Sequence, residues 1–167
     1  MANLKTVRLK PNPPGKDRTR RGGASQTQLG AEWIDLQNTS GQSLSLTGVA
    51  IYHIAYGSGH PNGQWEKVTD LSGSVPANQT LRVHSGSGPL AQLRPEDIQG
   101  AELHRFTNRD QFVWNNAEGD CAALTMAAKF DPFDKACYDP NPPEGVVLVR
   151  QGDKLVVSTV SAAYARR

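Results

Sequence analysis

The sequence predicts an all-β fold, a sandwich of about seven to nine short antiparallel strands. Sixteen glycines and eleven prolines among 167 residues supply the many turns that short strands need. Several short stretches alternate between apolar and polar side chains, and no stretch has helical periodicity over more than about two turns. A chain of this length can bury a substantial core as a single domain without disulfide or metal staples.

The first half of the chain contains four stretches with the alternation of half-buried strands. In the second stretch, Ile34 and Leu36 share one face while Trp33 and Asp35 share the other. Gly48 interrupts the third stretch, which indicates a bulge or a bend between sheets. The four stretches span residues 4–10, 31–38, 44–51 and 80–84.

The segments between these strands predict loops. Residues 16–30 are first basic and then rich in Gly, Ser and Gln, which is typical of a flexible exposed loop. The glycine-rich segment Tyr56–Trp65 predicts a long loop that carries aromatic residues. Pro95–Gln99 predicts one helical turn, with proline at its first position and acidic residues near its positive end.

The last third of the chain predicts two pairs of strands separated by an irregular segment. Phe112–Asn115 and Cys121–Met126 form a strand, turn, strand pattern. Residues 127–144 are rich in proline and predict an irregular insertion. Residues 145–150 and 154–160 predict a hairpin around a Gln-Gly-Asp turn.

Charge and cysteine content set limits on compartment and partners. The net charge of +2 is too small to require a polyanionic partner. No apolar run is long enough to span a bilayer, and the N-terminus has no signal-peptide pattern, so we expect a cytoplasmic protein if that end is native and an exported one if a signal was removed. Cys121 and Cys137 permit one disulfide; free thiols fit the cytoplasm, and a bridge fits export.

Five short motifs occur along the chain in a fixed order. Together they resemble the lamin-tail domain family, of the type found in many bacterial proteins, which is an immunoglobulin-like module. The resemblance covers about residues 4–124 and implies one immunoglobulin-like β-sandwich domain over 1–167, with an insertion at 127–144 and a structural or interaction role. The motifs are Glu-Trp-Ile-Asp-Leu-Gln-Asn (32–38), Leu-Ser-Leu-Thr-Gly (44–48), Val-Pro-Ala-Asn-Gln-Thr-Leu-Arg-Val (75–83), Val-Trp-Asn-Asn (113–116) and Gly-Asp-Cys-Ala-Ala-Leu (119–124).

The residues that carry the resemblance also have a structural interpretation. Tryptophans on strands supply large buried area. Asparagine and aspartate at strand ends bind free backbone groups in turns. We therefore expect structural roles for Trp33, Asn38, Trp114, Asn115, Asn116 and Asp120.

Catalytic and metal sites are weakly indicated. No nucleophile-elbow motif occurs, and Cys121 alternates with Ala122 as a packing residue does. The histidines lack zinc spacing, and the aspartates match no calcium loop. We therefore expect no enzyme activity, no cofactor and no metal. The residues weighed are His53, His60, His84 and His104 for zinc and Asp131, Asp134 and Asp139 for calcium.

Binding to a protein partner through loops at one end of the sandwich is the expected function. Exposed aromatic residues anchor many interfaces, so Tyr56, His60 and Trp65 are the candidate contacts. The alternative is a nucleic-acid-binding module, because clustered cations between glycines fit a phosphate backbone. Its candidate contacts are Lys16, Arg18, Arg20 and Arg21. The sequence leaves the partner's identity and the oligomeric state open.

Overall fold

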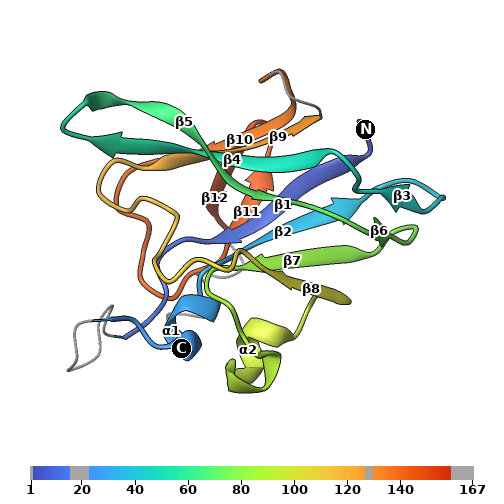
Figure 1. Ribbon diagram of the computed structural model, residues 1–167, viewed down its shortest axis with the longest axis horizontal. Coiled ribbons are helices and arrows are strands. Elements are labelled where there is room, and N and C mark those ends of the chain that lie inside the picture. The colour runs from blue at the N-terminus through green and yellow to red at the C-terminus, as the bar shows by residue number, and fades with distance from the viewer. Residues whose placement is uncertain (1, 16–22, 127–129, 159–167) are drawn as a thin grey trace.

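The chain folds into a large curled β-sheet (Figure 1). The computed structural model describes residues 2–15, 23–126 and 130–158. Ten strands form this sheet in the order β5-β4-β9-β10-β12-β11-β1-β2-β7-β8, and β3 pairs with β6 in a separate two-stranded sheet. The all-β prediction is confirmed. The strands are β1 (Leu4–Lys10), β2 (Trp33–Asn38), β3 (Leu44–Ser45), β4 (Val49–Gly57), β5 (His60–Asp70), β6 (Ser74–Val75), β7 (Thr80–His84), β8 (Leu103–Phe106), β9 (Asp120–Met126), β10 (Pro132–Tyr138), β11 (Leu148–Gln151) and β12 (Lys154–Val157).

In the described part of the chain, helical structure is confined to short pieces. They are α1 (Gln26–Gly30), the 3-10 turn η1 (Leu90–Gln92) and α2 (Pro95–Ile98). Figure 1 shows α1 and α2 at the same end of the sheet, where the Thr27 hydroxyl donates to the carbonyl of Gln92. Within the described ranges, no helix has the length and apolar character needed to cross a membrane.

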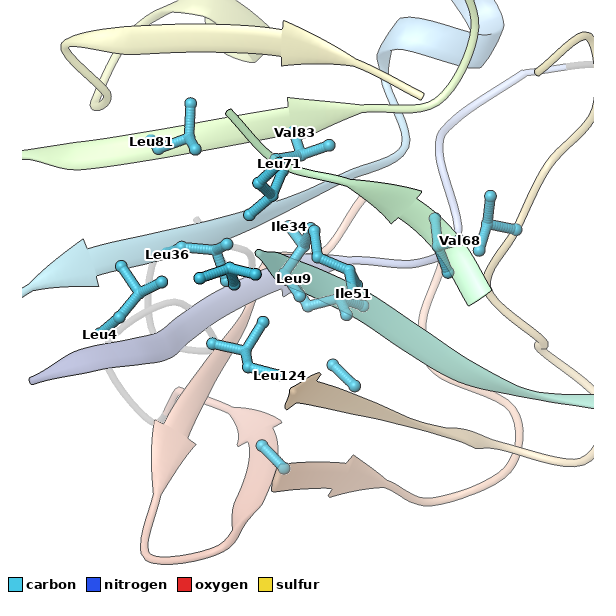
Figure 2. Close-up of a cluster of buried hydrophobic side chains, with 14 of the residues drawn as sticks. Leu4, Leu9, Ile34, Leu36, Ile51, Val68, Leu71, Leu81, Val83 and Leu124 are labelled. Atoms are coloured by element: carbon cyan, nitrogen blue, oxygen red, sulfur yellow. The ribbon is translucent and has the colours of Figure 1, made fainter. Parts of the chain in front are cut away.

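The sheet curls so that its two halves face each other across one core. Leu9, Ile34 and Val83 line the inner face of the β1-β2-β7 half. They meet Ile51 on β4 and Leu124 on β9 from the other half, as Figure 2 shows. All five side chains are almost fully buried, and complete burial of a side chain of this kind contributes roughly 1.5–3 kcal/mol.

One segment links the two edges of the curled sheet. Residues 107–114 leave β8, and Arg109 forms an isolated bridge with Gly86 beside β7. The guanidinium of Arg109 then reaches β5, where it donates to a carboxylate oxygen of Glu66 at 3.1 Å and to the carbonyl of Lys67 at 2.6 Å. A backbone carbonyl of the edge strand is thereby occupied.

Several predicted elements are confirmed by the structure. The strand at residues 4–10, the helical turn after Arg94 and the C-terminal hairpin all form. Gly48 has a φ of +82° and separates β3 from β4, which belong to different sheets. The prediction of purely antiparallel pairing is wrong at two places, because β7 pairs in parallel with β8 and β10 pairs in parallel with β12.

The predicted aromatic loop is wrong, because Tyr56–Trp65 is a continuation of the β4–β5 hairpin. A two-residue turn, Ser58-Gly59, joins the strands where Gly57 opposes His60. Gly63 has a φ of +81°, and a Cβ at this position would lie 2.3 Å from Ile54 Cγ2. Gly63, one of the glycines that indicated a loop, is therefore needed by the hairpin itself.

Three further expectations are also wrong. Residues 112–115 form no strand, and side chains rather than a neighbouring strand accept the backbone N–H groups of Val113, Trp114 and Asn115. Residues 127–144, which were expected to be irregular, contain β10. Its alternation was not recognised because a polar residue, Asp134, occupies an inward position. The end of the predicted flexible loop is α1, which begins with a reciprocal capping box between Ser25 and Gln28.

Candidate functional site

Asp120 organises the base of the β4–β5 hairpin. Its carboxylate, which is buried, accepts the backbone N–H of Ile54 at 2.7 Å, of Cys121 at 2.8 Å and of Asn115 at 3.1 Å. The Asn115 amide also donates to Asp120 at 2.8 Å and to the carbonyl of Ile54 at 2.6 Å. His53 Nδ1 lies 2.9 Å from the same carboxylate. One acidic side chain thus fixes β4, β9 and the 113–116 loop together.

Glu32 anchors the other end of this loop from inside the core. Its two carboxylate oxygens accept the backbone N–H groups of Val113 and Trp114, each at 2.9 Å, and Oε2 also accepts the Ser85 hydroxyl. Complete burial raises the pKa of Glu32 to about 8, while these hydrogen bonds oppose the shift. The first and fourth sequence motifs therefore meet through Glu32.

The remaining asparagines of the motifs lie apart from this network or at its margin. Asn38 donates to the carbonyls of Gln42 at 2.7 Å and Val75 at 2.9 Å, while its oxygen accepts the N–H of Ser40 at 2.9 Å. It therefore holds the turn between β2 and β3. The carbonyl of Asn116 accepts the N–H of Asn141 at 2.7 Å, next to the 113–116 loop.

An aromatic surface, consisting of Tyr52, Trp65 and Phe130, covers the outer face of the β4–β5 hairpin. The ring of Phe130 lies 5.2 Å from that of Tyr52 and 5.0 Å from that of Trp65. Tyr52 and Trp65 are half-buried, whereas Phe130 is 38% exposed. The register places Cys121 on the same outer face. A disulfide there joins Cys121 to Cys137, the residue directly opposite it on β10.

The predicted contact residues are distributed along this hairpin. His60 is exposed at the turn, Tyr56 is half-buried beside Gly63, and Trp65 packs on Phe130. Only Trp65 among them belongs to the aromatic surface. The basic candidates Lys16, Arg18, Arg20 and Arg21 lie outside the described residues.

The outer face of the other half of the sheet carries a charged cluster, formed by Arg8, Lys10, Asp35, Arg82 and Asp97. Arg82 donates to both carboxylate oxygens of Asp35, at 2.7 and 2.8 Å. Arg8 Nε lies 2.9 Å from the same carboxylate. Because Arg82 also donates to the carbonyls of Asp97 and Gln99, it fixes the 85–102 segment over the sheet.

Trp33 lies inside this charged cluster. The guanidinium carbon of Arg82 is 3.5 Å from the centroid of the Trp33 ring, which is a cation–π contact. The indole Nε1 donates to Asp97 Oδ1 at 2.9 Å, and Lys10 Nζ lies 2.6 Å from the same oxygen. Trp33 is therefore buried by polar groups rather than by the apolar core.

Two histidines extend the cluster toward α1. His84 Nδ1 lies 2.6 Å from the carbonyl of Gly30, and His84 Nε2 lies 2.9 Å from His104 Nδ1. The Gly30 contact requires a proton on Nδ1, so Nε2 accepts a hydrogen bond from His104 in the neutral pair. Burial lowers the pKa of His84 to about 4 and also lowers the pKa of His104.

Several of the acidic and histidine side chains considered for metal binding have other partners, among them His53, His84, His104 and Asp134. Asp134 accepts the N–H of Thr6 at 2.8 Å and binds Arg150 through both oxygens. Among the residues that the structure describes, no three His, Cys, Asp or Glu side chains form a group that could hold a metal ion. His53 Nε2, the free nitrogen of the His53–Asp120 pair, lies 3.8 Å from Glu66 Oε1 rather than beside a nucleophile.

No protein-family model matches the chain, and no curated protein matches it either. The lamin-tail resemblance therefore remains a prediction. The sequence interpretation missed Tyr52 and Phe130 as surface residues and missed the charged cluster altogether. The alternation of Asp35 with Ile34 and of Arg82 with Leu81 was the available signal, since it assigns opposite charges to one outer face.

Proposed function

We propose that the chain is a non-catalytic interaction module with a lamin-tail-type, immunoglobulin-like sandwich, and that it binds a protein partner through its aromatic surface. The exposure of Phe130 next to Trp65 and Tyr52 is the observation that carries this proposal. Aromatic side chains combine large apolar area with low conformational entropy, and for that reason they dominate binding energy at interfaces. The partner would offer apolar side chains to the rings.

The arrangement beneath the aromatic surface supports this role. Asp120 and its partners fix β4 at Ile54, immediately behind the rings. The disulfide fixes β9 to β10 on the same face. A surface held by rigid strands loses little freedom when a partner binds, which lowers the cost of association.

The sheet edge next to the aromatic surface is less suited to binding than the face. Arg109 occupies the carbonyl of Lys67 on edge strand β5, and Pro61 on the same strand lacks a backbone donor. Both features hinder the addition of a further strand. We therefore assign the contact to the side chains of the face.

A pair of exposed apolar residues provides the test. Phe130 is 38% exposed on the aromatic surface, and Val157 is 39% exposed on β12. The Phe130→Ser and Val157→Ser variants are immobilised beside the wild type, partners are captured, and the affinity of a captured partner is measured by titration. We expect Phe130→Ser to weaken binding by tenfold or more, about 1.4 kcal/mol or above, and Val157→Ser to leave it unchanged.

Equal binding by the wild type and Phe130→Ser would overturn the proposal. Thermal unfolding of both variants separates lost contact from lost structure, because a contact role leaves the melting temperature of Phe130→Ser near that of the wild type. The nucleic-acid alternative depends on residues 16–21, which lie outside the described residues, and no observation on the described part of the chain favours it.

A further inference from the structure

Lys10 and Asp97 form a buried pair that joins β1 to α2. The side chain of Lys10 is 5% exposed, that of Asp97 is 0% exposed, and Nζ lies 2.6 Å from Oδ1. The two residues are 87 positions apart in the sequence. We propose that they condense into an isopeptide bond, an amide between Lys10 Nζ and Asp97 Cγ, which closes the chain covalently between β1 and α2.

The proposal is supported by polar groups of this pair that lack hydrogen-bond partners among the described residues. Oδ2 of Asp97 is buried and has no hydrogen-bond partner among the described residues. Lys10 Nζ has three donors as an ammonium, and Asp97 Oδ1 is its hydrogen-bond partner in the described chain. Unpaired buried donors and acceptors are costly, as are buried charges. Condensation removes the unbonded oxygen, two N–H bonds and both charges at once.

The surrounding residues hold both reacting groups in place. Trp33 Nε1 donates to Asp97 Oδ1 at 2.9 Å, and the carbonyl of Asp97 accepts from Arg82 at 3.0 Å. Lys10 is paired in the β1–β2 ladder opposite Trp33. An amine and a carboxyl group held in contact react with effective molarities that no bimolecular encounter reaches.

The reaction needs no further reactant. Transfer of one proton from the ammonium to the carboxylate, across the contact between Nζ and Oδ1, discharges both groups. The amine lone pair then attacks Cγ, the C–N bond forms and the C–Oδ2 bond breaks. Oδ2 leaves as water with two of the three ammonium protons. Oδ1 becomes the amide oxygen, and Trp33 Nε1–H, a positioning donor, stabilises the negative charge that develops on it.

A second lysine–aspartate pair on β1 is a natural control. Lys5 Nζ lies 3.6 Å from Asp134 Oδ1, but the Lys5 side chain is 40% exposed. Arg150 binds both oxygens of that carboxylate. Water and Arg150 satisfy the charges of this pair, so it has no reason to condense.

The mass of the intact, folded chain tests the proposal. After reduction of the Cys121–Cys137 disulfide, we expect the wild type to weigh one water molecule less than its sequence, and Lys5→Arg to show the same deficit. Lys10→Arg, in which a guanidinium replaces the amine, is expected to have its full sequence mass. A wild-type chain of full sequence mass after prolonged incubation in the folded state would overturn the proposal without reference to any variant.

Peptide sequencing by tandem mass spectrometry excludes the other source of this mass loss. An internal imide at Asp97 would also release one water molecule, but it would persist in Lys10→Arg and would produce no branched peptide. The isopeptide bond predicts a branched tryptic peptide that joins residues 9–16 to residues 83–105. Trp33→Phe, which keeps an aromatic ring and loses the indole N–H donor, is expected to slow the appearance of that peptide. A mass deficit without the branched peptide would refute the bond.

Discussion

The two outer faces of the curled sheet differ in how their side chains are covered and paired. Outside β1, β2 and β7, the charged cluster is covered by the 85–102 segment, and its charges are paired with one another or with backbone carbonyls. Outside β4 and β5, the aromatic surface keeps an exposed ring, that of Phe130. The inner faces of both halves contribute to a single core.

This difference separates the side chains that stabilise the fold from the side chains that are available for binding. A buried charge without its partner is strongly unfavourable, so each member of the charged cluster depends on the others. An exposed aromatic ring costs little and is dispensable for folding. Substitutions on the charged face should therefore change stability, whereas substitutions on the aromatic face should change binding.

Arg82→Met is expected to have the largest effect on the charged face. It removes two bonds to Asp35, two bonds to backbone carbonyls and the contact with Trp33. Removal of one partner from a buried ion pair costs about 3–5 kcal/mol. The free energy of unfolding is measured by urea denaturation. Arg105→Met is the control, because Arg105 is exposed on neighbouring β8 and its loss should cost less than about 0.5 kcal/mol. Equal stability of the two variants would contradict a structural role for the charged cluster.

Reduction of the disulfide is the next largest expected effect, and it acts on the aromatic face. The bridge closes a loop of 16 residues between β9 and β10, so its loss should lower the free energy of unfolding by roughly 3 kcal/mol on the chain-entropy model. The Cys121→Ala, Cys137→Ala double variant is compared with the wild type in urea, and a thiol assay establishes the oxidation state. Equal midpoints for an oxidised wild type and the double variant would show that the strands need no bridge.

Acidification should lower the free energy of unfolding through protonation of His84, which lies beside the charged cluster. Its pKa falls from the ordinary value of 6.5 to about 4 in the folded chain, so the unfolded chain binds the proton first. The stabilisation is complete above pH 6.5 and declines as the pH falls from 6.5 to 4, by about 2–3 kcal/mol. Protonation would place N–H groups of His84 and His104 against each other, near Arg82.

The pH effect of His84 is isolated by comparison with a variant. Glu32 has a raised pKa of about 8. Its contribution to the free energy of unfolding is therefore present below pH 4.5 and is lost as the pH rises through 8. The two slopes oppose each other between pH 4.5 and 6.5. Urea midpoints of the wild type and His84→Gln are therefore subtracted at each pH. A difference that does not change between pH 4 and 7 would show that His84 titrates normally.

Much of the sheet was predictable because alternation alone determines which face of a strand is buried. β1, β7 and the C-terminal hairpin follow it directly. β10 was missed because Asp134 occupies an inward position, and only the distant Arg150 and Thr6 make that acceptable. Residues 112–115 were predicted as a strand, but the carboxylates of Glu32 and Asp120 bind the backbone N–H groups of Val113 and Asn115 in place of a neighbouring strand.

The candidate site was less predictable than the sheet. Trp65 was predicted to lie in an aromatic loop, whereas it lies on β5, and its neighbours depend on pairings between strands. Phe130 comes shortly after β9 and far along the sequence from Tyr52, and the β4–β9 ladder brings the two regions together. Likewise, Lys10 and Asp97 each look like surface residues, and their meeting depends on how the 85–102 segment folds back over β1 and β2.

Phe130→Ser should have the smallest effect on stability, and it tests the comparison of the two faces most directly. Phe130 is outside every strand and helix and 38% exposed. Its loss therefore removes its ring contacts with Tyr52 and Trp65 and little of the core. We expect the free energy of unfolding to fall by less than about 1 kcal/mol. Urea denaturation beside Arg82→Met gives the measurement. A loss comparable to that of Arg82→Met would mean that Phe130 belongs to the structure, and that the aromatic surface exists to close the fold rather than to receive a partner.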